Sequence, residues 1–511
     1  MPAGDVAHRP VRYKGLLTVF VMGAMLMQVL DATIANVALP HMQASLGATA
    51  DSVTWVLTSY ILAVAIAIPL SGWISARFGI RNVLLASVAT FVLASMLCGM
   101  AANLQQMVFF RLLQGVGGAF LAPLAQTIML DINKPSDHPR AMTTYGMAVM
   151  IGPIAGPIIG GWLTDNFDWR WVFYVNAPVG VACWIGLWAL LPHAQNNRRP
   201  FDMLGWAFIA VALGALQLML DRGPHAGWFD STEIWIYTGT SAAGFWCFAV
   251  HLATSSRPLF PLAMLKDRNL LTGSSLLFTI ALVMMSTLAI LPSMLQGLYG
   301  YTVVDTGLLL AVRGAAMMMA MWLAGRTSHR ADPRAVMALG FVLLILSLWM
   351  MTGWSLEMDW RPVVTSGFVQ GLGLGFAFAP LNILTFATLP PHLRTDASSL
   401  FSLARSLGAS IGIAVVTALT ARNIQTSHAD LAAAVTPYNL PLDPSMADRF
   451  GPFGGAAMMM LDGIVNKQAI MIAYLDDFQF MMIASGLLMP ILLFIRPPAR
   501  GAASSPPVMM E

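Results

Sequence analysis

Long uninterrupted apolar segments constrain this chain more than any other feature of its sequence. A helix that crosses a bilayer needs about 20 mostly apolar residues, because each residue advances the helix axis by about 1.5 Å. Fourteen segments meet this criterion. They lie near residues 16–38, 53–73, 82–101, 106–128, 142–163, 172–192, 204–221, 234–253, 271–293, 303–324, 336–353, 362–388, 398–420 and 478–495. The sequence therefore predicts an all-α polytopic membrane protein with 14 transmembrane helices.

The composition agrees with a lipid environment. Of 511 residues, 57% are hydrophobic and 10% are charged, whereas a soluble domain carries about 25% charged residues. The net charge of +3 is small and scattered, so no basic stripe indicates nucleic acid as a partner. The basic N-terminus runs into the first span without a small-residue cleavage site, which predicts an uncleaved first helix.

The distribution of positive charge predicts the orientation in the membrane. If the N-terminus is cytoplasmic, eighteen of the 27 Lys and Arg residues fall in cytoplasmic segments and six in outer segments. The remaining three, Arg111, Arg313 and Arg405, lie inside spans. This bias follows the positive-inside rule. Because the number of spans is even, we expect both termini to be cytoplasmic.

The longest connection, 421–477, lies on the outer side in this topology. Connections of this length in compact proteins are functional elements or disordered segments. The stretch "GGAAMMMLDGIVNKQAIMIAYL" within it has the composition of an amphipathic helix. A passive tether between the last two spans is the alternative interpretation.

An internal repeat divides the chain into halves. The stretch "LLQGVGGAFLAPL" in the fourth span returns as "FVQGLGLGFAFAPL" in the twelfth, at an offset of 256 residues. A glycine followed by two arginines also recurs, at an offset of 253 residues: Gly72, Arg77 and Arg81 return as Gly325, Arg330 and Arg334. Parallel repeats of this kind are typical of two-bundle transporters. We predict an N-terminal six-helix bundle over 1–200, two inserted linker helices over 201–268, and a C-terminal six-helix bundle over 269–511.

Two charged residues stand at similar depth in the outer half of the first bundle. Asp31 lies in the first span and Arg111 in the fourth. A lone charge at such depth costs up to about 2.5 kcal/mol, so buried charges pair or face water. We expect both to face one cavity within the bundle. Burial raises the pKa of a carboxyl and a nearby arginine lowers it, so the pair is a candidate proton switch. The alternative is a static salt bridge that holds two helices together.

The repeat does not duplicate this pair. The offset of 253 to 256 residues places Asp31 opposite Met284–Thr287, and Arg111 opposite Gly367. No second carboxylate is expected deep in a span, because Asp131, Asp221 and Asp305 fall near span ends. A net positive interior favours neutral, weakly acidic or amphipathic substrates over dications. The candidate residues for a substrate cavity are Gln28, Asn36, Gln114, Gln126 and Arg313.

The fifth span contains a glycine stripe, "GPIAGPIIGG". Small residues spaced four apart let helices approach closely, and proline removes a backbone hydrogen bond and bends a helix. The stripe therefore predicts a rigid, bent element at a seam, where it seals one half against the other. Ordinary small-residue packing is the alternative. The residues concerned are Gly152, Gly156, Pro157, Gly160 and Gly161.

Together these stretches resemble the fourteen-spanner drug:H+ antiporters of the major facilitator superfamily, and most closely the EmrB-type efflux pumps of Gram-negative inner membranes. The matching stretches, in chain order, are "LDATIANVALP", "RLLQGVGGA", "GPIAGPIIGGW", "WRWVFYVNAPVG", "FDMLG", "LDRGPHAGWF" and "ARSLGASIG". The resemblance implies the major facilitator fold and export of hydrophobic or amphipathic toxic compounds, driven by the proton gradient without a cofactor.

The resemblance also implies roles for individual residues. It assigns Asp31 and Arg111 to proton coupling and the fifth-span stripe to antiport. It implies a periplasmic membrane-fusion adaptor and an outer-membrane channel as partners. The loop after the second span would act as a gating loop, through Gly72, Arg77, Gly79 and Arg81. One departure stands out: Ala76 occupies the position at which the superfamily usually has an aspartate.

Three other functions compete with export as interpretations of the sequence. A proton-coupled symporter importing a small metabolite would share the fold and could also use Asp31, but it does not account for the fifth-span stripe. A membrane enzyme or receptor would need a catalytic or metal-binding cluster, and no spacing such as HExxH occurs. A channel would need a charged ring or a filter sequence, which is not evident. We therefore expect a transporter and not an enzyme.

Overall fold

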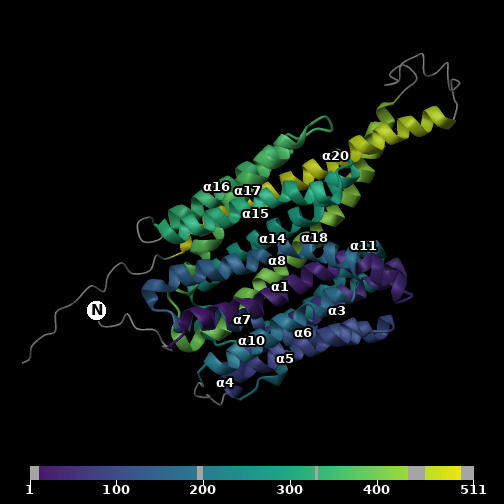
Figure 1. The fold of residues 1–511 in the computed structure, drawn as a ribbon. Coiled ribbons are helices and arrows are strands. Elements are labelled where there is room, and N and C mark those ends of the chain that lie inside the picture. The colour runs from purple at the N-terminus through teal and green to yellow at the C-terminus, as the bar shows by residue number, and fades with distance from the viewer. Residues whose placement is uncertain (1–10, 193–199, 328–331, 436–454, 496–511) are drawn as a thin grey trace, which may run out of the picture.

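The computed structural model describes residues 11–192, 200–327, 332–435 and 455–495, and these form helices joined by short connections, without a β-strand (Figure 1). We refer to the helices α1 to α10 as the first bundle. They are α1 (Lys14–Ser45), α2 (Ala50–Val53), α3 (Trp55–Ala67), η1 (Ile68–Leu70), α4 (Ser71–Phe78), α5 (Ile80–Gly99), α6 (Leu104–Gly118), α7 (Leu121–Ile132), η2 (Pro135–Asp137), α8 (His138–Asn166), α9 (Trp171–Tyr174) and α10 (Asn176–Leu190).

Two long helices separate the first bundle from the second, which comprises α14 to α20. The intervening elements are α11 (Met203–Ala226), η3 (Trp228–Asp230), α12 (Thr232–Thr254) and α13 (Leu262–Leu265). The second bundle contains α14 (Arg268–Gly297), α15 (Val303–Thr327), α16 (Pro333–Thr352), α17 (Trp360–Phe386), η4 (Pro391–Leu393), α18 (Arg394–Ala434), α20 (Gly455–Leu488) and η5 (Met489–Phe494).

Thirteen helical spans in the described part of the chain are long and apolar enough to cross a membrane. They coincide with thirteen of the fourteen expected segments. The remaining segment, 234–253, is helix α12, which has 23 residues and is therefore long enough at roughly 34 Å. Its Thr, Ser and Gly residues make it less apolar than the other spans. The protein is thus a multi-pass membrane protein, and the fourteenth crossing stays a prediction.

The expectation of a long loop over 421–477 is wrong for most of its length. Helix α18 continues to Ala434 and helix α20 begins at Gly455, so the predicted helix near the end of this segment is the first part of α20. The continuation of α18 is explained by its sequence, "ARNIQTSHADLAAA", which is rich in helix-forming residues and has no proline. Residues 436–454 lie outside the described residues.

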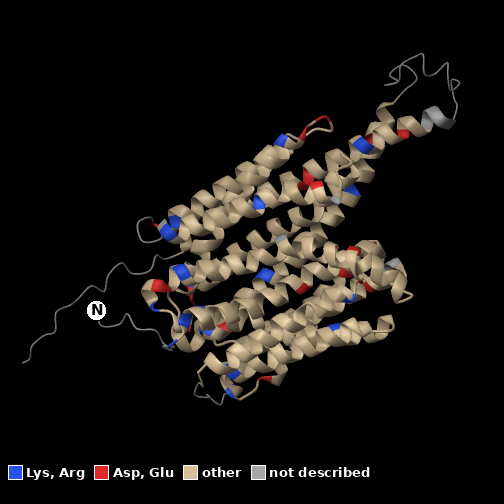
Figure 2. Cartoon of the chain, viewed as in Figure 1, with Lys and Arg blue, Asp and Glu red and all other residues tan. Residues whose placement is uncertain are grey.

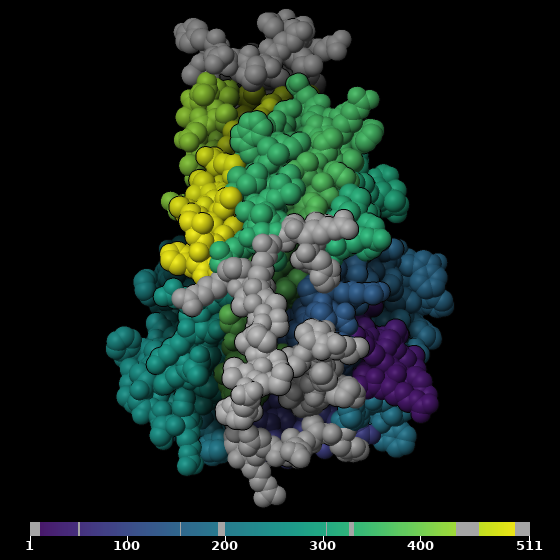
Figure 3. Space-filling view, turned by 90° about the vertical axis from the view of Figure 1, so that its left-hand side faces the viewer, coloured from purple at the N-terminus to yellow at the C-terminus, as the bar shows by residue number. Residues whose placement is uncertain are grey.

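The two inserted helices attach to the first bundle. The indole Nε1 of Trp206 on α11 donates a hydrogen bond to the backbone oxygen of Ile66 in α3 (3.3 Å). Helix α12 packs closely on α11. A Cβ atom at Gly244 would lie only 3.0 Å from the backbone of Ala212, and the Ser241 hydroxyl donates a hydrogen bond to the backbone oxygen of Ala212 (3.0 Å). Seen from the end near the N-terminus, purple and blue residues lie below green and yellow residues (Figure 3).

The described hydrogen bonds and ion pairs that join the two bundles all lie at one end of the molecule, where α1 and α8 begin. We call these contacts the inter-bundle seam. They are Arg394–Asp131 (3.0 Å), Arg394 to the oxygen of Leu130 (3.5 Å), Thr127–Ser398 (3.3 Å), Gln126–Asn382 (3.2 Å) and Ser399 to the oxygen of Ile68 (2.6 Å). Towards the other end, α18 and α20 diverge from the first bundle (Figure 1).

Charged residues gather towards the ends of the helices, and few occupy their middle (Figure 2). This distribution is what a bilayer imposes, since charges are costly in the hydrocarbon region. The few interior charges are therefore the residues that need a specific explanation.

Candidate functional site

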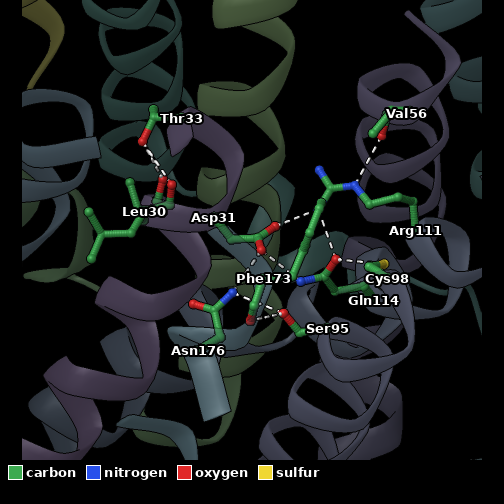
Figure 4. Close-up of polar contacts among 11 residues, drawn as sticks. Leu30, Asp31, Thr33, Val56, Ser95, Cys98, Arg111, Gln114, Phe173 and Asn176 are labelled. Carbon is green, nitrogen blue, oxygen red and sulfur yellow. Dashed lines mark hydrogen bonds and ion pairs between the residues drawn. The ribbon is translucent and has the colours of Figure 1, made fainter. Parts of the chain in front are cut away.

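The structure brings Asp31 of α1 and Arg111 of α6 together inside the first bundle (Figure 4). The Nη1 of Arg111 lies 2.6 Å from Oδ2 of Asp31, and both side chains are 0% exposed. Ion pairs this deeply buried are stable only when further hydrogen bonds satisfy the remaining polar atoms. The surroundings of each partner therefore decide what the pair can do.

The Asp31 carboxylate accepts hydrogen bonds from three donors. Besides Arg111, these are Nε2 of Gln114 (2.8 Å) and Nδ2 of Asn176 (2.9 Å), both bonded to Oδ1. An ionised carboxylate is an acceptor only, and hydrogen bonds to the charged form favour that form. All three donors therefore direct their N–H groups at the two carboxylate oxygens of Asp31.

Arg111 is held from the other side by backbone and aromatic groups. Its Nε donates to the backbone oxygen of Val56 (3.0 Å). The guanidinium carbon lies 4.2 Å from the ring centroid of Tyr60 and 5.6 Å from that of Phe173, which is cation–π distance. Its Nη2 has no hydrogen-bond partner among the described residues. Val56, Tyr60 and Phe173 thus give Arg111 contacts that do not depend on Asp31. If the carboxylate loses its charge, the guanidinium keeps these contacts.

The local sequence explains why these groups meet. Gln114 follows Arg111 by three residues, so both side chains lie on the same face of α6, and Nη1 of Arg111 also donates to Oε1 of Gln114 (2.8 Å). Gly115 lets α6 approach α3, because a Cβ atom there would lie 2.6 Å from the oxygen of Tyr60. Asn103 caps the start of α6 by accepting from the amide of Gln106 (2.9 Å).

The expected open cavity beside the pair is not found in this conformation. Asp31, Arg111 and Gln114 are all 0% exposed, so water does not reach them. The five candidate cavity residues are also dispersed. Two of them border the ion pair: Gln114 bonds to Asp31, and Gln28 is buried in α1 beside Tyr60, whose ring contacts Arg111. The other three lie elsewhere: Asn36 is exposed, Gln126 lies in the inter-bundle seam, and Arg313 lies in the second bundle.

The segment expected to act as a gating loop forms a helix, a turn and a second helix. Helix α4 ends at Phe78, and the next residue, Gly79, has a φ of 84°, which is readily adopted only by glycine. The two arginines diverge: Arg77 is exposed, whereas Arg81 donates to the backbone oxygen of Trp188 at the end of α10.

Gly72 faces the second bundle across the inter-bundle seam. A Cβ atom at Gly72 would collide with the carboxylate of Asp396, in the first turn of α18. Ala76 provides no carboxylate here, and an acidic side chain from the opposite bundle lies against this helix instead.

The glycine stripe of α8 packs against α1, within the first bundle. Cβ atoms at Gly152 and Gly156 would lie 2.4 Å from Val29 and 2.0 Å from Thr33, on either side of Asp31 in sequence. Gly160 contacts Ile34, whereas Gly161 faces open space and Pro157 is exposed. These glycines therefore set the spacing between the Asp31 helix and its neighbour. Another part of α8 meets the second bundle, since Gly146 faces Met321 and Phe378, and the sealing role of the helix stays a prediction.

The second bundle has a related glycine stripe. Gly408 and Gly412 of α18 lie 256 residues after Gly152 and Gly156. Cβ atoms at these positions would lie 2.3 Å from the oxygen of Phe278 and 2.7 Å from that of Leu282, both in α14. Glycines thus bring the equivalent helix pairs, α1 with α8 and α14 with α18, close together in both bundles. From the sequence alone, this second pair of glycines was not identified as part of the repeat.

Arg313 of α15 is buried in the second bundle without an acidic partner among the described residues. Its Nη1 donates to Oγ1 of Thr287 (3.0 Å) and to Oε1 of Gln370 (3.1 Å), and its Nη2 donates to the oxygen of Met284 (3.4 Å). Gly367, opposite Arg111 in the repeat, leaves space near the Cβ of Arg313 (3.8 Å). Helix α17 thus has no arginine at position 367, and the buried arginine of the second bundle comes from the neighbouring helix α15.

Sequence reasoning missed two buried polar groups. Asn176 bonds to both Asp31 and the hydroxyl of Ser95 (3.0 Å), and a polar residue inside an apolar segment was the available signal. Asp477 was assigned to the loop before the last span, but α20 includes it and it is 0% exposed. It hydrogen-bonds to Thr420 of α18. The expectation of no second buried carboxylate is therefore wrong.

No group of three His, Cys, Asp or Glu side chains that could hold a metal ion occurs among residues 11–192, 200–327, 332–435 and 455–495.

Two repeated helical bundles around interior charges, joined at one end, define a transporter of the two-bundle class. A family model described as Major Facilitator Superfamily matches residues 21–413. The chain belongs to the major facilitator superfamily, which confirms the expected fold.

Curated relatives share about a third of the sequence. The chain is 34% identical to "Multidrug export protein EmrB" of Escherichia coli (strain K12) over 427 residues, 83% of this chain and 83% of that protein. It is 34% identical to "Fatty acid resistance protein FarB" of Neisseria gonorrhoeae over 480 residues, 93% of this chain and 94% of that protein. These similarities confirm the expected resemblance to EmrB-type pumps.

Solved structures agree on the fold. The proton:xylose symporter XylE has a TM-score of 0.59 at 13% identity, over 93% of this chain and 95% of XylE. The human transporter MFSD10 also has a TM-score of 0.59 at 13% identity, over 92% of this chain and 99% of that chain. At this level of identity the likeness concerns the fold alone.

Proposed function

We propose that this protein is a proton-coupled exporter (a drug:H+ antiporter) of hydrophobic or amphipathic toxic compounds across the inner membrane, with both termini in the cytoplasm. The single observation that carries the proposal is the dry Asp31–Arg111 pair, the only described ion pair whose two side chains are both 0% exposed. The names of the relatives, multidrug export and fatty acid resistance, support the substrate class.

The pair functions as a switch between two hydrogen-bonded states. When Asp31 is ionised, it accepts from Arg111, Gln114 and Asn176. A proton arriving at Oδ2 removes the charge and displaces Nη1 of Arg111 from that oxygen. The guanidinium keeps Val56 and the Tyr60 ring as partners. A proton moving down a potential of about 100 mV supplies about 2.3 kcal/mol, which is available for reorienting the bundles.

The distribution of inter-bundle contacts supports an outward-facing assignment for this conformation. With the proposed orientation, the seam that includes Arg394–Asp131 and Thr127–Ser398 closes the cytoplasmic end. Because α8 packs on α1 through the glycine stripe, a movement of α8 changes the surroundings of Asp31 directly. Helix α8 also meets the second bundle, where Gly146 faces Met321 and Phe378, so in the proposed cycle a movement between the bundles reaches Asp31 through α8.

We further propose that the pump works with a periplasmic membrane-fusion adaptor and an outer-membrane channel. The outer parts of α18 and α20 support this, because α18 has 41 residues, roughly 62 Å of helix, about twice the 30 Å hydrocarbon core. Replacing 430–465 by a short linker should spare transport in proteoliposomes and abolish resistance in whole cells. Full resistance of such cells would exclude this docking site.

Direction of transport decides between export and the alternative, symport of a small metabolite. Inverted membrane vesicles are energised until their interior is acidic, and a hydrophobic drug is added. Exchange predicts immediate proton efflux from the vesicles, since each drug molecule entering the lumen is coupled to protons leaving it. Symport predicts the opposite pH change. No pH change with any of a panel of drugs would contradict proton coupling altogether.

A further inference from the structure

Arg313 occupies, in the second bundle, the environment that the ion pair occupies in the first. Thr287 and Gln370, which receive its Nη1 hydrogen bonds, lie 256 residues after Asp31 and Gln114. Each bundle thus holds one guanidinium between its first and fourth repeat helices. The difference is at the carboxylate position, which is a threonine in the second bundle.

The guanidinium of Arg313 is consequently a buried cation without a counter-ion among the described residues. A charge inside the membrane usually pairs with an opposite charge or contacts water, and Thr287, Gln370 and Met284 provide only neutral oxygens. These three bonds use Nη1 and Nη2, and Nε bonds to no described residue. Arg313 is 8% exposed, whereas Arg111 is 0% exposed, so its surroundings are not fully closed.

A second donor without a partner lies beside it. The Nε2 of Gln370 is buried and bonds to no described residue, while Oε1 of the same amide accepts from Arg313. A buried amide N–H group without an acceptor costs about 1–3 kcal/mol. One oxygen-bearing anion placed here would accept from both the guanidinium and this amide, and would satisfy both deficits together.

We propose that Arg313 and Gln370 bind the carboxylate of an amphipathic, singly charged substrate such as a medium-chain fatty acid. This inference rests on the proposed export function and specifies its substrate class. Charge-assisted hydrogen bonds from arginine to carboxylate are about twice as strong as neutral ones, so the head group is recognised by charge. The apolar tail then lies among the apolar side chains of the second bundle, and the first bundle handles the proton separately.

The experiment compares three ligands with the same ten-carbon chain. Decanoate, decanol and decylamine are titrated against the purified full-length protein in nanodiscs at pH 7.5. The variants are Arg313→Gln, Arg313→Lys and Thr287→Asp. The last keeps Arg313 but places a carboxylate at the position that matches Asp31, where it competes with the ligand. The matched control is Arg361→Gln, which removes an arginine whose side chain is 75% exposed.

Arg313→Gln and Thr287→Asp should each weaken decanoate binding about ten-fold or more and leave decanol binding within two-fold. Arg313→Lys should retain part of the affinity, and Arg361→Gln should change nothing. Decanol binding reports that each variant is folded. Decanoate affinity within two-fold of the native value in both Arg313→Gln and Thr287→Asp would overturn the proposal, as would equal loss of decanol and decanoate.

Failure of the export function would look different. If the native protein binds decanoate through Arg313 but drugs release no protons from vesicles, the site stands and proton-coupled export fails. If the native protein exchanges drugs for protons but Arg313→Gln does not affect decanoate, export stands and the anion site is excluded.

Discussion

The two bundles contain the same kind of interior charge in two different states. In the first, Arg111 is paired with Asp31 and the site is dry; in the second, Arg313 is surrounded by neutral oxygens. In the proposed mechanism the first bundle gains and loses a proton at its carboxylate, whereas the second binds a negatively charged group. A duplicated scaffold has kept the place of the cation and changed its partner.

The comparison also shows how a repeat preserves an environment without preserving a residue. Position 367 has a glycine where the first bundle has Arg111, and the guanidinium reaches the same neighbourhood from α15. The equivalent place in the first bundle, 253 residues earlier, is Tyr60, whose ring lies against Arg111. The arginine therefore comes from the fourth helix of the first repeat and from the second helix of the second repeat.

The largest expected effect is on proton exchange, and it should be confined to the first bundle. Asp31→Asn keeps the shape and a hydrogen-bonding oxygen at this site, but it cannot take up a proton. We expect loss of drug-induced proton efflux from inverted vesicles, with drug binding still measurable. Arg313→Gln serves as the comparison and should still exchange decanol-like neutral substrates. Normal drug resistance in cells that carry Asp31→Asn would refute the switch.

The next effect is on stability, with opposite outcomes in the two bundles. Arg111→Met leaves Asp31 buried without a counter-ion, which should cost about 3–5 kcal/mol. Arg313→Met removes an unpaired cation, so we expect no loss of stability or a gain. Thermal unfolding in one detergent measures both. Adding Asp31→Asn to Arg111→Met should recover part of the loss, and similar destabilisation by the two Met variants would contradict the assignment of Arg313 as unpaired.

A smaller effect tests the two glycine stripes. Gly156→Ala forces a Cβ against Thr33, and Gly412→Ala forces one against Leu282, so each should cost about 1–3 kcal/mol by overpacking. Gly161→Ala is the control, since nothing lies within 4 Å of that position. If the first stripe acts in antiport beyond packing, only Gly156→Ala should also reduce proton efflux per drug molecule. If both variants lose drug–proton exchange equally, the glycines of the first stripe act only through helix packing.

The smallest expected effect concerns the seam between the bundles. Asp131→Asn removes the charge opposite Arg394 but keeps an acceptor, so the seam should weaken by only about 1 kcal/mol. The yield of a disulfide between Thr127→Cys and Ser398→Cys, whose hydroxyls lie 3.3 Å apart, reports closure. We expect several-fold slower cross-linking in the Asp131→Asn background. An unchanged rate would show that Arg394–Asp131 does not hold this end closed.

The membrane-spanning architecture was predictable because it depends on local composition. Apolar length identified thirteen spans directly, and the repeat offset paired the halves. Helix α12 shows the limit of that rule, since its hydroxyl and glycine residues lower its hydropathy while its length is retained. The amphipathic helix expected before the last span is the first part of α20. The last apolar run begins at residue 478, so the sequence does not show that the two form one helix, and Asp477 stays outside the span that buries it.

The site was predictable only in part, because partners distant in sequence decide it. The similar depth of Asp31 and Arg111 in their spans predicted that the two residues meet. That Asn176 also contacts Asp31 became visible only in the structure. Asn36 shows the converse: one turn beyond Asp31 on the same helix, its side chain is exposed. Apolar periodicity is nearly absent in such helices, so their sequence does not reveal which face is interior. The environment of Arg313 likewise required the arrangement of three helices.

Helix α18 links the seam to the far side of the molecule in one rigid rod. Its first turn carries Arg394 and Asp396, and the same helix continues unbroken to Ala434. A rod of roughly 62 Å moves its distal tip by about 1 Å for every degree of tilt at its base. A small tilt of α18 at the seam therefore produces a larger displacement of its other end near Ala434. A protein bound to that end would be displaced by the same amount each time the helix tilts.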